Sequence, residues 1–94
     1  MLRKNELKHK ITLYDLEEGE EGIIVGLDER MGYGLRRRLY ALGLMPSMKV
    51  KVLAKWGPIR ISVYHFKIPI VENLALGKGV ASRIYVMRYD KNSC

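Results

Sequence analysis

The clearest periodic pattern in the chain is a set of leucines at helical spacing. Leu35, Leu39 and Leu42 occupy positions i, i+4 and i+7, so they would share one face of a helix. Gly43 follows at the position where a left-handed residue commonly ends a helix. Pro46 cannot continue a helix and favours a turn into the next segment. The pattern therefore predicts one short helix, from Leu35 to Leu42, followed by a sharp turn.

Alternating or β-branched segments predict strands on both sides of this helix. Residues 23–27, 48–53, 59–64 and 83–87 have the composition or the apolar–polar alternation of short strands. A Gly-Pro pair separates the second of these strands from the third. Gly26 lies inside the first strand, which predicts a bulge or a close backbone approach there.

The remaining segments predict turns and an edge piece. Leu13 and Leu16 lie three positions apart, which predicts a single helical turn with Thr12 as its N-cap. Residues 65–71 are expected to continue as an extended segment, and the proline within them predicts an edge or bulged strand. Glu72 and Asn73 are expected to form a turn. Residues 77–82 predict a tight turn and a short helical stub.

Together these elements predict a mainly β domain. About five short strands, one α-helix and a short helical turn, without βαβ alternation, are typical of a small, partly open SH3-like barrel. We expect this barrel to span residues 11–88. Residues 1–10 are interpreted as a flexible basic N-terminal tail and residues 89–94 as a polar C-terminal tail.

Composition agrees with one small domain of 94 residues that has a basic surface. The formal net charge is +7, from 17 Lys and Arg against 10 Asp and Glu, which suits an anionic partner. A well-solvated surface accounts for much of this charge, because basic and acidic residues alternate in blocks. No apolar run approaches the roughly 18 residues of a membrane helix, and no signal peptide is recognisable. We therefore expect a soluble cytoplasmic protein without membrane insertion.

Residues that could support chemistry are few. The only histidines are His9 and His65, and the only cysteine is Cys94. They form no ligand pair with the spacing of a metal site, and a terminal cysteine cannot form an internal disulfide. Ser62 and His65 would face opposite sides of a strand, and Gly77-Lys78-Gly79 lacks the frame of a phosphate-binding loop. We predict no catalytic residues, no metal ligands and no cofactor.

Aromatic and basic residues do interleave in the second half of the chain, at Trp56, Arg60, Tyr64 and Phe66. Small barrels use such surfaces either to hold protein segments or to stack nucleic-acid bases. Nothing in the pattern specifies a nucleic acid, so the signal for one is not strong. A protein partner and a nucleic acid both remain open at this point.

Three segments resemble the FeoA domain family. They are "ITLYDLEEGEEGIIVGL", "RRRLYALGLMPSMKVKVL" and "LALGKGVASRIYV", and they occur in the family's order from Ile11 to about Arg88. The residues that match the family's structural motifs are Arg38, Leu39, Leu42, Gly43, Leu44, Pro46, Leu76, Gly77 and Ala81. Ser47 departs from the family pattern, which usually has glycine after the proline. Either a type I turn or a slightly strained turn is expected there.

The resemblance implies an SH3-like barrel and a small cytoplasmic accessory protein of ferrous iron uptake. Such a protein would act on the GTPase-linked permease FeoB, through its cytoplasmic GTP-binding domain. The resemblance also implies a link to ferrous iron or another transition metal, which the residues themselves do not indicate. In the barrel, Leu39, Leu42 and Leu44 would pack onto one open end, and the helix arginines would be left for a partner.

The leading hypothesis is thus a non-enzymatic adaptor that binds and modulates FeoB. The residues expected to contact the partner are Arg36, Arg37, Trp56, Arg60, Tyr64 and Phe66. A nucleic-acid-binding barrel and a regulatory domain that binds a transition metal directly are the alternatives. A homo-oligomer is compatible with each of these hypotheses.

Overall fold

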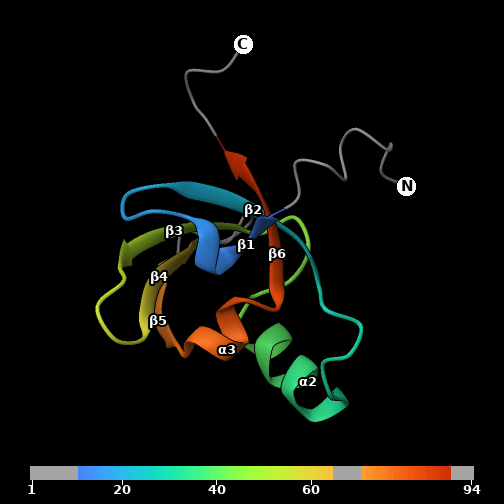
Figure 1. Cartoon of the computed structure of the whole chain (residues 1–94). Coiled ribbons are helices and arrows are strands. Elements are labelled where there is room, and N and C mark those ends of the chain that lie inside the picture. Colours follow the sequence, from blue (N-terminus) through green and yellow to red (C-terminus); the bar gives the residue numbers. More distant parts are fainter. Residues whose placement is uncertain (1–10, 65–70, 90–94) are drawn as a thin grey trace.

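The computed structural model describes residues 11–64 and 71–89 (Figure 1). Six antiparallel strands form one sheet in the order β1-β6-β2-β3-β4-β5. The elements in chain order are β1 (Ile11–Thr12), the 3₁₀ helix η1 (Leu13–Asp15), β2 (Glu21–Leu27), α2 (Tyr33–Ala41), β3 (Lys49–Ala54), β4 (Ile59–Tyr64), β5 (Val71–Leu76), α3 (Lys78–Ala81) and β6 (Ile84–Tyr89). No helix in these two ranges is long and apolar enough to cross a bilayer.

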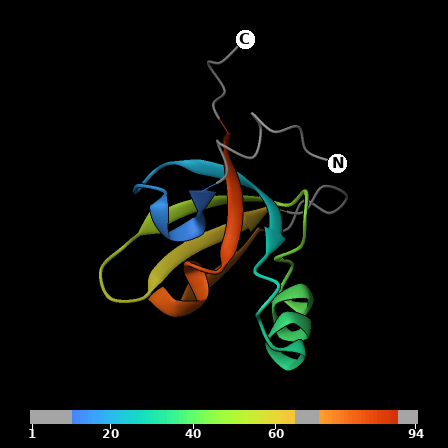
Figure 2. The ribbon, with the colours of Figure 1, turned by 45° about the vertical axis from the view of Figure 1, so that its right-hand side comes forward.

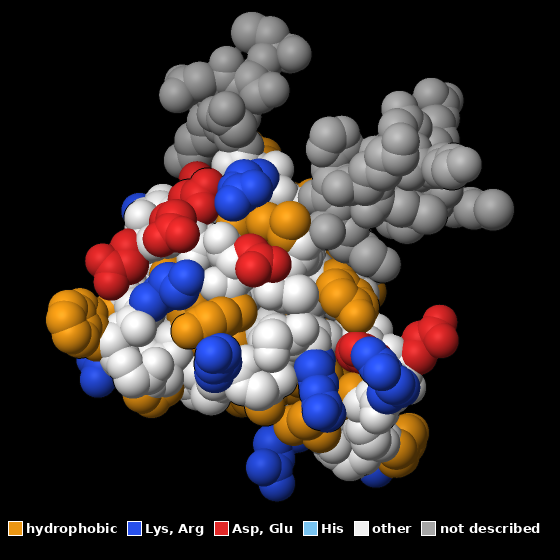
Figure 3. All heavy atoms as spheres, viewed as in Figure 1, with side chains coloured by type: hydrophobic (Ala, Val, Ile, Leu, Met, Phe, Trp, Pro, Cys, Tyr) orange, Lys and Arg blue, Asp and Glu red, His pale blue; other side chains and the backbone are white. Residues whose placement is uncertain are grey.

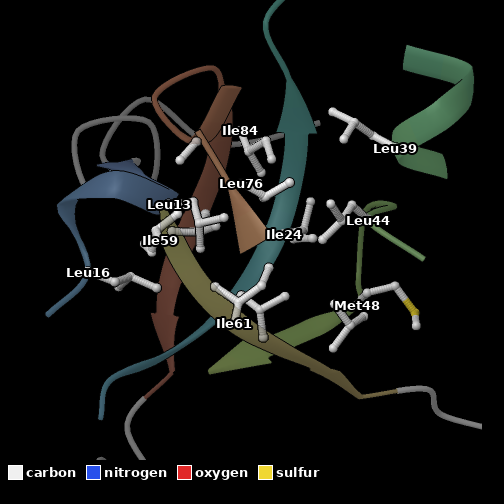
Figure 4. Packing of buried hydrophobic residues seen from close by; sticks show 14 of the residues in the cluster. Leu13, Leu16, Ile24, Leu39, Leu44, Met48, Ile59, Ile61, Leu76 and Ile84 are labelled. Atoms are coloured by element: carbon white, nitrogen blue, oxygen red, sulfur yellow. The ribbon is translucent and has the colours of Figure 1, made fainter. Parts of the chain in front are cut away.

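The sheet curls around a single core and forms an SH3-like barrel (Figures 1 and 4). The alternation predicted for the central strands is present, because Val50 and Val52 of β3 pair with Val63 and Ile61 of β4 and all four side chains are buried. Ile24 and Leu44 meet them from other elements (Figure 4). Burial of these aliphatic side chains is the main stabilising contribution to so small a domain.

Two strand assignments differ from the expectation of about five strands. β1 is only two residues long, too short to carry a periodic signal, and is defined by its pairing with β6. The turn expected at Glu72 and Asn73 is wrong, because both residues lie inside β5 and pair with β4. The Oγ–H of Ser62 donates to Oδ1 of Asn73 over 2.9 Å, so a cross-strand partner outweighs the local turn preference of Asn. The extended segment expected at residues 65–70 lies outside the described residues.

The two shortest helical elements lie against each other at the end of the barrel where α3 is seen in Figure 1. The carboxylate of Asp15 accepts hydrogen bonds from the backbone N–H and the hydroxyl of Thr12, at 2.9 and 3.0 Å, which confirms Thr12 at the start of η1. Leu13 and Ala81 bury their side chains from η1 and α3 respectively.

Helix α2 lies beside the barrel and outside the sheet (Figure 2). It begins two residues earlier than predicted, at Tyr33, and ends at Ala41. Among the residues of the helix only Leu39 is fully buried, with 2% of its surface exposed, and Leu35 packs partly against the core. Most of the helix surface therefore remains open to solvent or to a partner.

The end of α2 is a complete Schellman motif. The N–H of Gly43 donates to the carbonyl of Tyr40 over 3.0 Å, and the N–H of Leu44 donates to that of Leu39 over 2.9 Å. Gly43 has φ +91°, which glycine adopts without strain. Leu44 is fully buried, whereas Leu42 is half-buried and lies outside the core cluster, so the predicted packing of Leu42 is wrong. Leu42 is the C-cap residue, one position beyond the last residue of α2, and Leu44 after the turn fills the core instead.

The following turn resolves the question at Ser47. The N–H of Met48 donates to the carbonyl of Met45 over 3.1 Å, and Ser47 has φ +79°. With Pro46 before it, this is the type II geometry that favours glycine at the third position. Ser47 is the only non-glycine residue with positive φ in the described part of the chain, so the expected alternative of mild strain is the one that the structure shows.

Candidate partner-binding site

A pocket of about 400 Å³ opens where β2 ends. The register of β2 against β6 shifts between Ile24 and Gly26, which confirms the predicted bulge. After Leu27, the last residue of β2, the chain continues into the loop that leads to α2. The residues that line the pocket are Val25, Gly26, Leu27, Asp28, Glu29, Arg30 and Tyr85.

Asp28 organises the polar wall of this pocket. Its Oδ1 accepts hydrogen bonds from the backbone N–H of Arg30 at 2.8 Å and from the Nε–H of Arg30 at 3.3 Å. Its Oδ2 accepts from Nη2 of Arg30 at 3.3 Å and from the hydroxyl of Tyr85 at 3.1 Å. The side chain and backbone of Arg30, with a smaller contribution from Tyr85, hold the pKa of the Asp28 carboxyl well below its ordinary value. The carboxyl is therefore ionised at neutral pH.

The charge of Asp28 raises the pKa values of the two side chains that contact it. The pKa of Tyr85 is raised, first because its hydroxyl donates to the Asp28 carboxylate and then because it is partly desolvated. The pKa of Arg30 is raised by the same carboxylate. These groups come from residues 57 positions apart in the sequence, so only the pairing of β2 with β6 brings them together.

Arg36 connects this pocket to helix α2. Its Nη2 donates to the backbone carbonyl of Asp28 over 3.0 Å, and the N–H of Met31 donates to the same carbonyl, also over 3.0 Å. Arg36 is accordingly half-buried. Its contact with Asp28 orients the start of α2 against the pocket loop, so part of its donor capacity is used inside the molecule.

The outward side of α2 carries exposed basic and aromatic residues. The guanidinium carbon of Arg37 lies 5.8 Å from the ring centroid of Tyr33, whose side chain is 73% exposed. Arg38 and Tyr40 are exposed as well. Figure 3 shows basic side chains over the α2 and α3 end of the molecule, and carboxylates both along the opposite edge and beside α2.

The other residues predicted to bind a partner lie elsewhere. Trp56, in the turn between β3 and β4, is 87% exposed, and Arg60 is exposed on β4. Tyr64 ends β4 at the far end from Trp56. Phe66 lies outside the described residues. The predicted residues that the structure describes therefore occupy three places: α2, the β3–β4 turn with Arg60, and the last residue of β4.

Several of the lysines that contribute to the positive net charge contact other side chains of the same domain. The ammonium of Lys49 lies 5.3 Å from the ring of Tyr64 and 4.6 Å from that of Tyr89, and 3.2 Å from the carboxylate of Glu21. The ring of Tyr14 has two ammonium groups near it, those of Lys55 at 4.7 Å and Lys78 at 5.3 Å. Because of these cation–π contacts, part of the positive charge is engaged within the domain.

The sequence analysis missed the cluster that forms the pocket wall. The sequence pattern gives no role to Asp28 or Arg30, and it places Tyr85 only as a residue of the strand expected at 83–87. An acidic residue directly after a strand with an arginine two positions later is a weak local signal. In the described ranges, no three His, Cys, Asp or Glu side chains gather in a way that could hold a metal ion.

Comparison with known proteins identifies the family. The model of the FeoA domain family matches residues 11–88. The protein in a crystal structure of an iron uptake regulatory protein (FeoA) has 32% sequence identity to this chain. The two structures match with a TM-score of 0.69, and the match covers 85% of this chain and 97% of the other. No curated protein sequence matches the chain.

Two more distant structures share the fold alone. The solution structure of the FeoA protein from Chlorobium tepidum has 22% identity and a TM-score of 0.68, over 88% of this chain and 74% of that one. A manganese-dependent transcriptional repressor has 18% identity and a TM-score of 0.75, and the match spans 85% of this chain but only 37% of the repressor. The family match over most of the chain and the shared barrel confirm the resemblance: this protein belongs to the FeoA domain family.

Proposed function

We propose that this protein is a non-enzymatic accessory protein of ferrous iron transport that binds and modulates the permease FeoB at its cytoplasmic GTPase domain. The match of the FeoA domain family over residues 11–88 carries this proposal. The protein would act in the cytoplasm, where that GTPase domain is exposed. Its contribution is recognition, because its exposed features are side chains suited to a protein interface.

The surface chemistry supports a protein partner. Tyr, Trp and Arg are the residues most enriched where protein interfaces gain their binding energy. Trp56 and Tyr33 are largely exposed, and Arg37 and Arg60 are exposed on separate elements. Arg36, Tyr64 and Phe66 complete the set of residues that we propose for contact with the partner.

The direct test is binding to the isolated GTPase domain of FeoB from the same organism. We expect isothermal titration calorimetry to give a dissociation constant in the micromolar range, and the GTP hydrolysis rate of the domain to change on saturation. The control is a lysozyme of similar net charge, which should neither bind nor change hydrolysis. If no binding occurs with GDP or with a non-hydrolysable GTP analogue, the proposal is wrong.

Two alternatives are separated by simple titrations. A nucleic-acid-binding barrel would bind a fluorescent oligonucleotide with an affinity that falls steeply as salt is raised. A metal-binding regulatory domain would give a saturable heat with Fe(II) or Zn(II) under anaerobic conditions. The proposal includes no resident metal and no nucleic acid, so we expect neither signal at micromolar protein.

A further inference from the structure

We propose that the pocket at the end of β2, with the arginines beside it, is the docking site for an extended acidic segment of the partner protein. One apolar side chain of that segment would occupy the pocket, and its carboxylates would pair with Arg30 and Arg37. This inference rests on the proposed function and specifies the surface and the chemistry of the partner.

The walls of the pocket supply the apolar part of the site. Val25, Leu27 and Tyr85 are among the residues that line the volume of about 400 Å³, which is ample for one aliphatic or aromatic side chain. Gly26 contributes no side chain, and a Cβ built on it would meet no atom within 4 Å. The bulge therefore leaves the pocket open at this point, so an incoming side chain can enter.

The arginines supply the charged part. The side chain of Arg30 is 89% exposed although it contacts Asp28. Its Nε–H and one N–H of Nη2 are engaged at 3.3 Å, which leaves three of its five donors for a second carboxylate. These two bonds are longer than the roughly 2.7–2.9 Å of strong charge-assisted pairs, so a small rotation toward a ligand costs little.

Helix α2 extends this charge beyond the pocket. Arg36 donates to the pocket loop, so the next residue, Arg37, is carried on a helix whose start is held against that loop. From Asp28 to Arg38 the chain has four arginines and two carboxylates, and the Asp28 carboxylate is paired with Arg30 and Tyr85. The excess of positive charge over this segment, next to the apolar wall of the pocket, is complementary to an acidic segment with an apolar residue inside it.

A nucleic acid fits this surface less well. Single-stranded nucleic acids bind along grooves in which cations follow the phosphates and aromatic faces are free to stack. Along the sheet, Lys49 and Lys55 already lie over the rings of Tyr64, Tyr89 and Tyr14. Among the described residues, α2 adds the exposed positive charges of Arg37 and Arg38 to that of Arg30 in the pocket lining.

The first test fills the pocket without disturbing the fold. Gly26→Phe places a ring where an added Cβ has open space, and Gly79→Phe makes the same change in α3, where a Cβ also meets nothing within 4 Å. We expect Gly26→Phe to weaken binding to the GTPase domain of FeoB by about tenfold or more. Gly79→Phe should bind as wild type, and both variants should keep the wild-type thermal midpoint. Equal binding by wild type and a folded Gly26→Phe would overturn the proposal.

The second test reverses charge at two exposed arginines. Arg37→Glu lies on α2 and Arg60→Glu lies on β4, so the two variants change the net charge equally. We expect about a tenfold or greater loss of affinity for Arg37→Glu and a smaller loss for Arg60→Glu, because Arg60 is a proposed contact residue that lies outside this docking site. The opposite ranking would place the interface at the β3–β4 hairpin and would refute the docking site argued above.

A third measurement keeps this inference separate from the choice of FeoB as partner. The probe is the acidic pentapeptide Glu-Asp-Leu-Asp-Glu, and its control is Gln-Asn-Leu-Asn-Gln. In ¹H–¹⁵N spectra of the wild-type protein, the acidic peptide should shift the amides of residues 25–30, Arg37 and Tyr85, and Gly26→Phe should abolish these shifts. Shifts elsewhere, no shifts at millimolar peptide, or shifts at these residues with an oligonucleotide alone would each overturn the inference. Peptide binding without GTPase-domain binding would refute only the proposed function.

Discussion

The N–H of Leu44 donates to the carbonyl oxygen of Leu39 over 2.9 Å, and the side chains of both leucines are buried in the core. This hydrogen bond belongs to the motif that ends helix α2. The helix also packs against the barrel here, because Leu39 is buried from its last turn and Leu44 is buried just after it (Figure 4). The arginines of α2 depend on this packing for their position beside the pocket.

Leucine truncations test this anchoring. Leu44→Ala removes a fully buried side chain and should lower the free energy of unfolding by about 2–5 kcal/mol. Leu42→Ala changes a half-buried residue outside the core cluster and should cost only about 1 kcal/mol. Urea denaturation followed by circular dichroism measures both free energies of unfolding. A larger loss for Leu42→Ala than for Leu44→Ala would contradict the packing described here.

The left-handed backbone at Gly43 gives a second prediction. Gly43→Ala forces a side chain onto φ +91° and should destabilise the protein by about 1–2 kcal/mol. Gly34→Ala is the matched control, because Gly34 lies within α2, has open space for a Cβ and should gain up to about 1 kcal/mol from helix propensity. Thermal unfolding of the two variants should therefore shift in opposite directions. A stabilising Gly43→Ala would show that the Schellman geometry is wrong.

Ser47 gives the converse case. Because Ser47 has φ +79° at the third position of a type II turn, Ser47→Gly should relieve strain and raise stability by about 0.5–1 kcal/mol. Ser47→Ala keeps the strain and should give no such gain. Denaturation midpoints of the three proteins decide the matter, and equal midpoints for glycine and alanine at this position would refute it.

The contacts of Asp28 make the stability of the folded protein depend on pH in the acidic range. A carboxyl whose pKa is depressed by folding contributes stability above its ordinary pKa of about 3.9, and this contribution is lost as pH falls toward the pKa of the folded state. Asp28→Asn should therefore be less stable than wild type at neutral pH, with a difference that narrows progressively below about pH 4. Thermal midpoints between pH 7 and pH 2 measure this difference.

Glu29→Gln provides the control for that experiment. It removes the same charge from the neighbouring, exposed position, so its stability should follow the wild type across the pH range. A constant difference between wild type and Asp28→Asn from pH 7 to pH 2 would mean that the folded-state pKa of Asp28 is not depressed.

Local patterns in the sequence determined the helix, its glycine end, the proline turn and the central strands. These features depend on interactions between residues a few positions apart, such as the leucine repeat ahead of Gly43. The FeoA motifs could be recognised for the same reason, since they are contiguous segments. The position of Gly26 in a β-branched strand was likewise enough to predict a bulge or a close backbone approach, and the structure shows the bulge.

Only the tertiary structure decided the short strand β1, the course of β5 through Glu72 and Asn73, the partial exposure of Leu42 and the pocket around Asp28. The pairing of β2 with β6 brings Asp28 to Tyr85, and the pairing of β4 with β5 gives Asn73 a partner in Ser62. Such contacts form between residues that are distant in the chain, so they cannot be predicted from local propensity and spacing. The candidate site is made of these contacts, and the sequence alone therefore identified the family but not the surface.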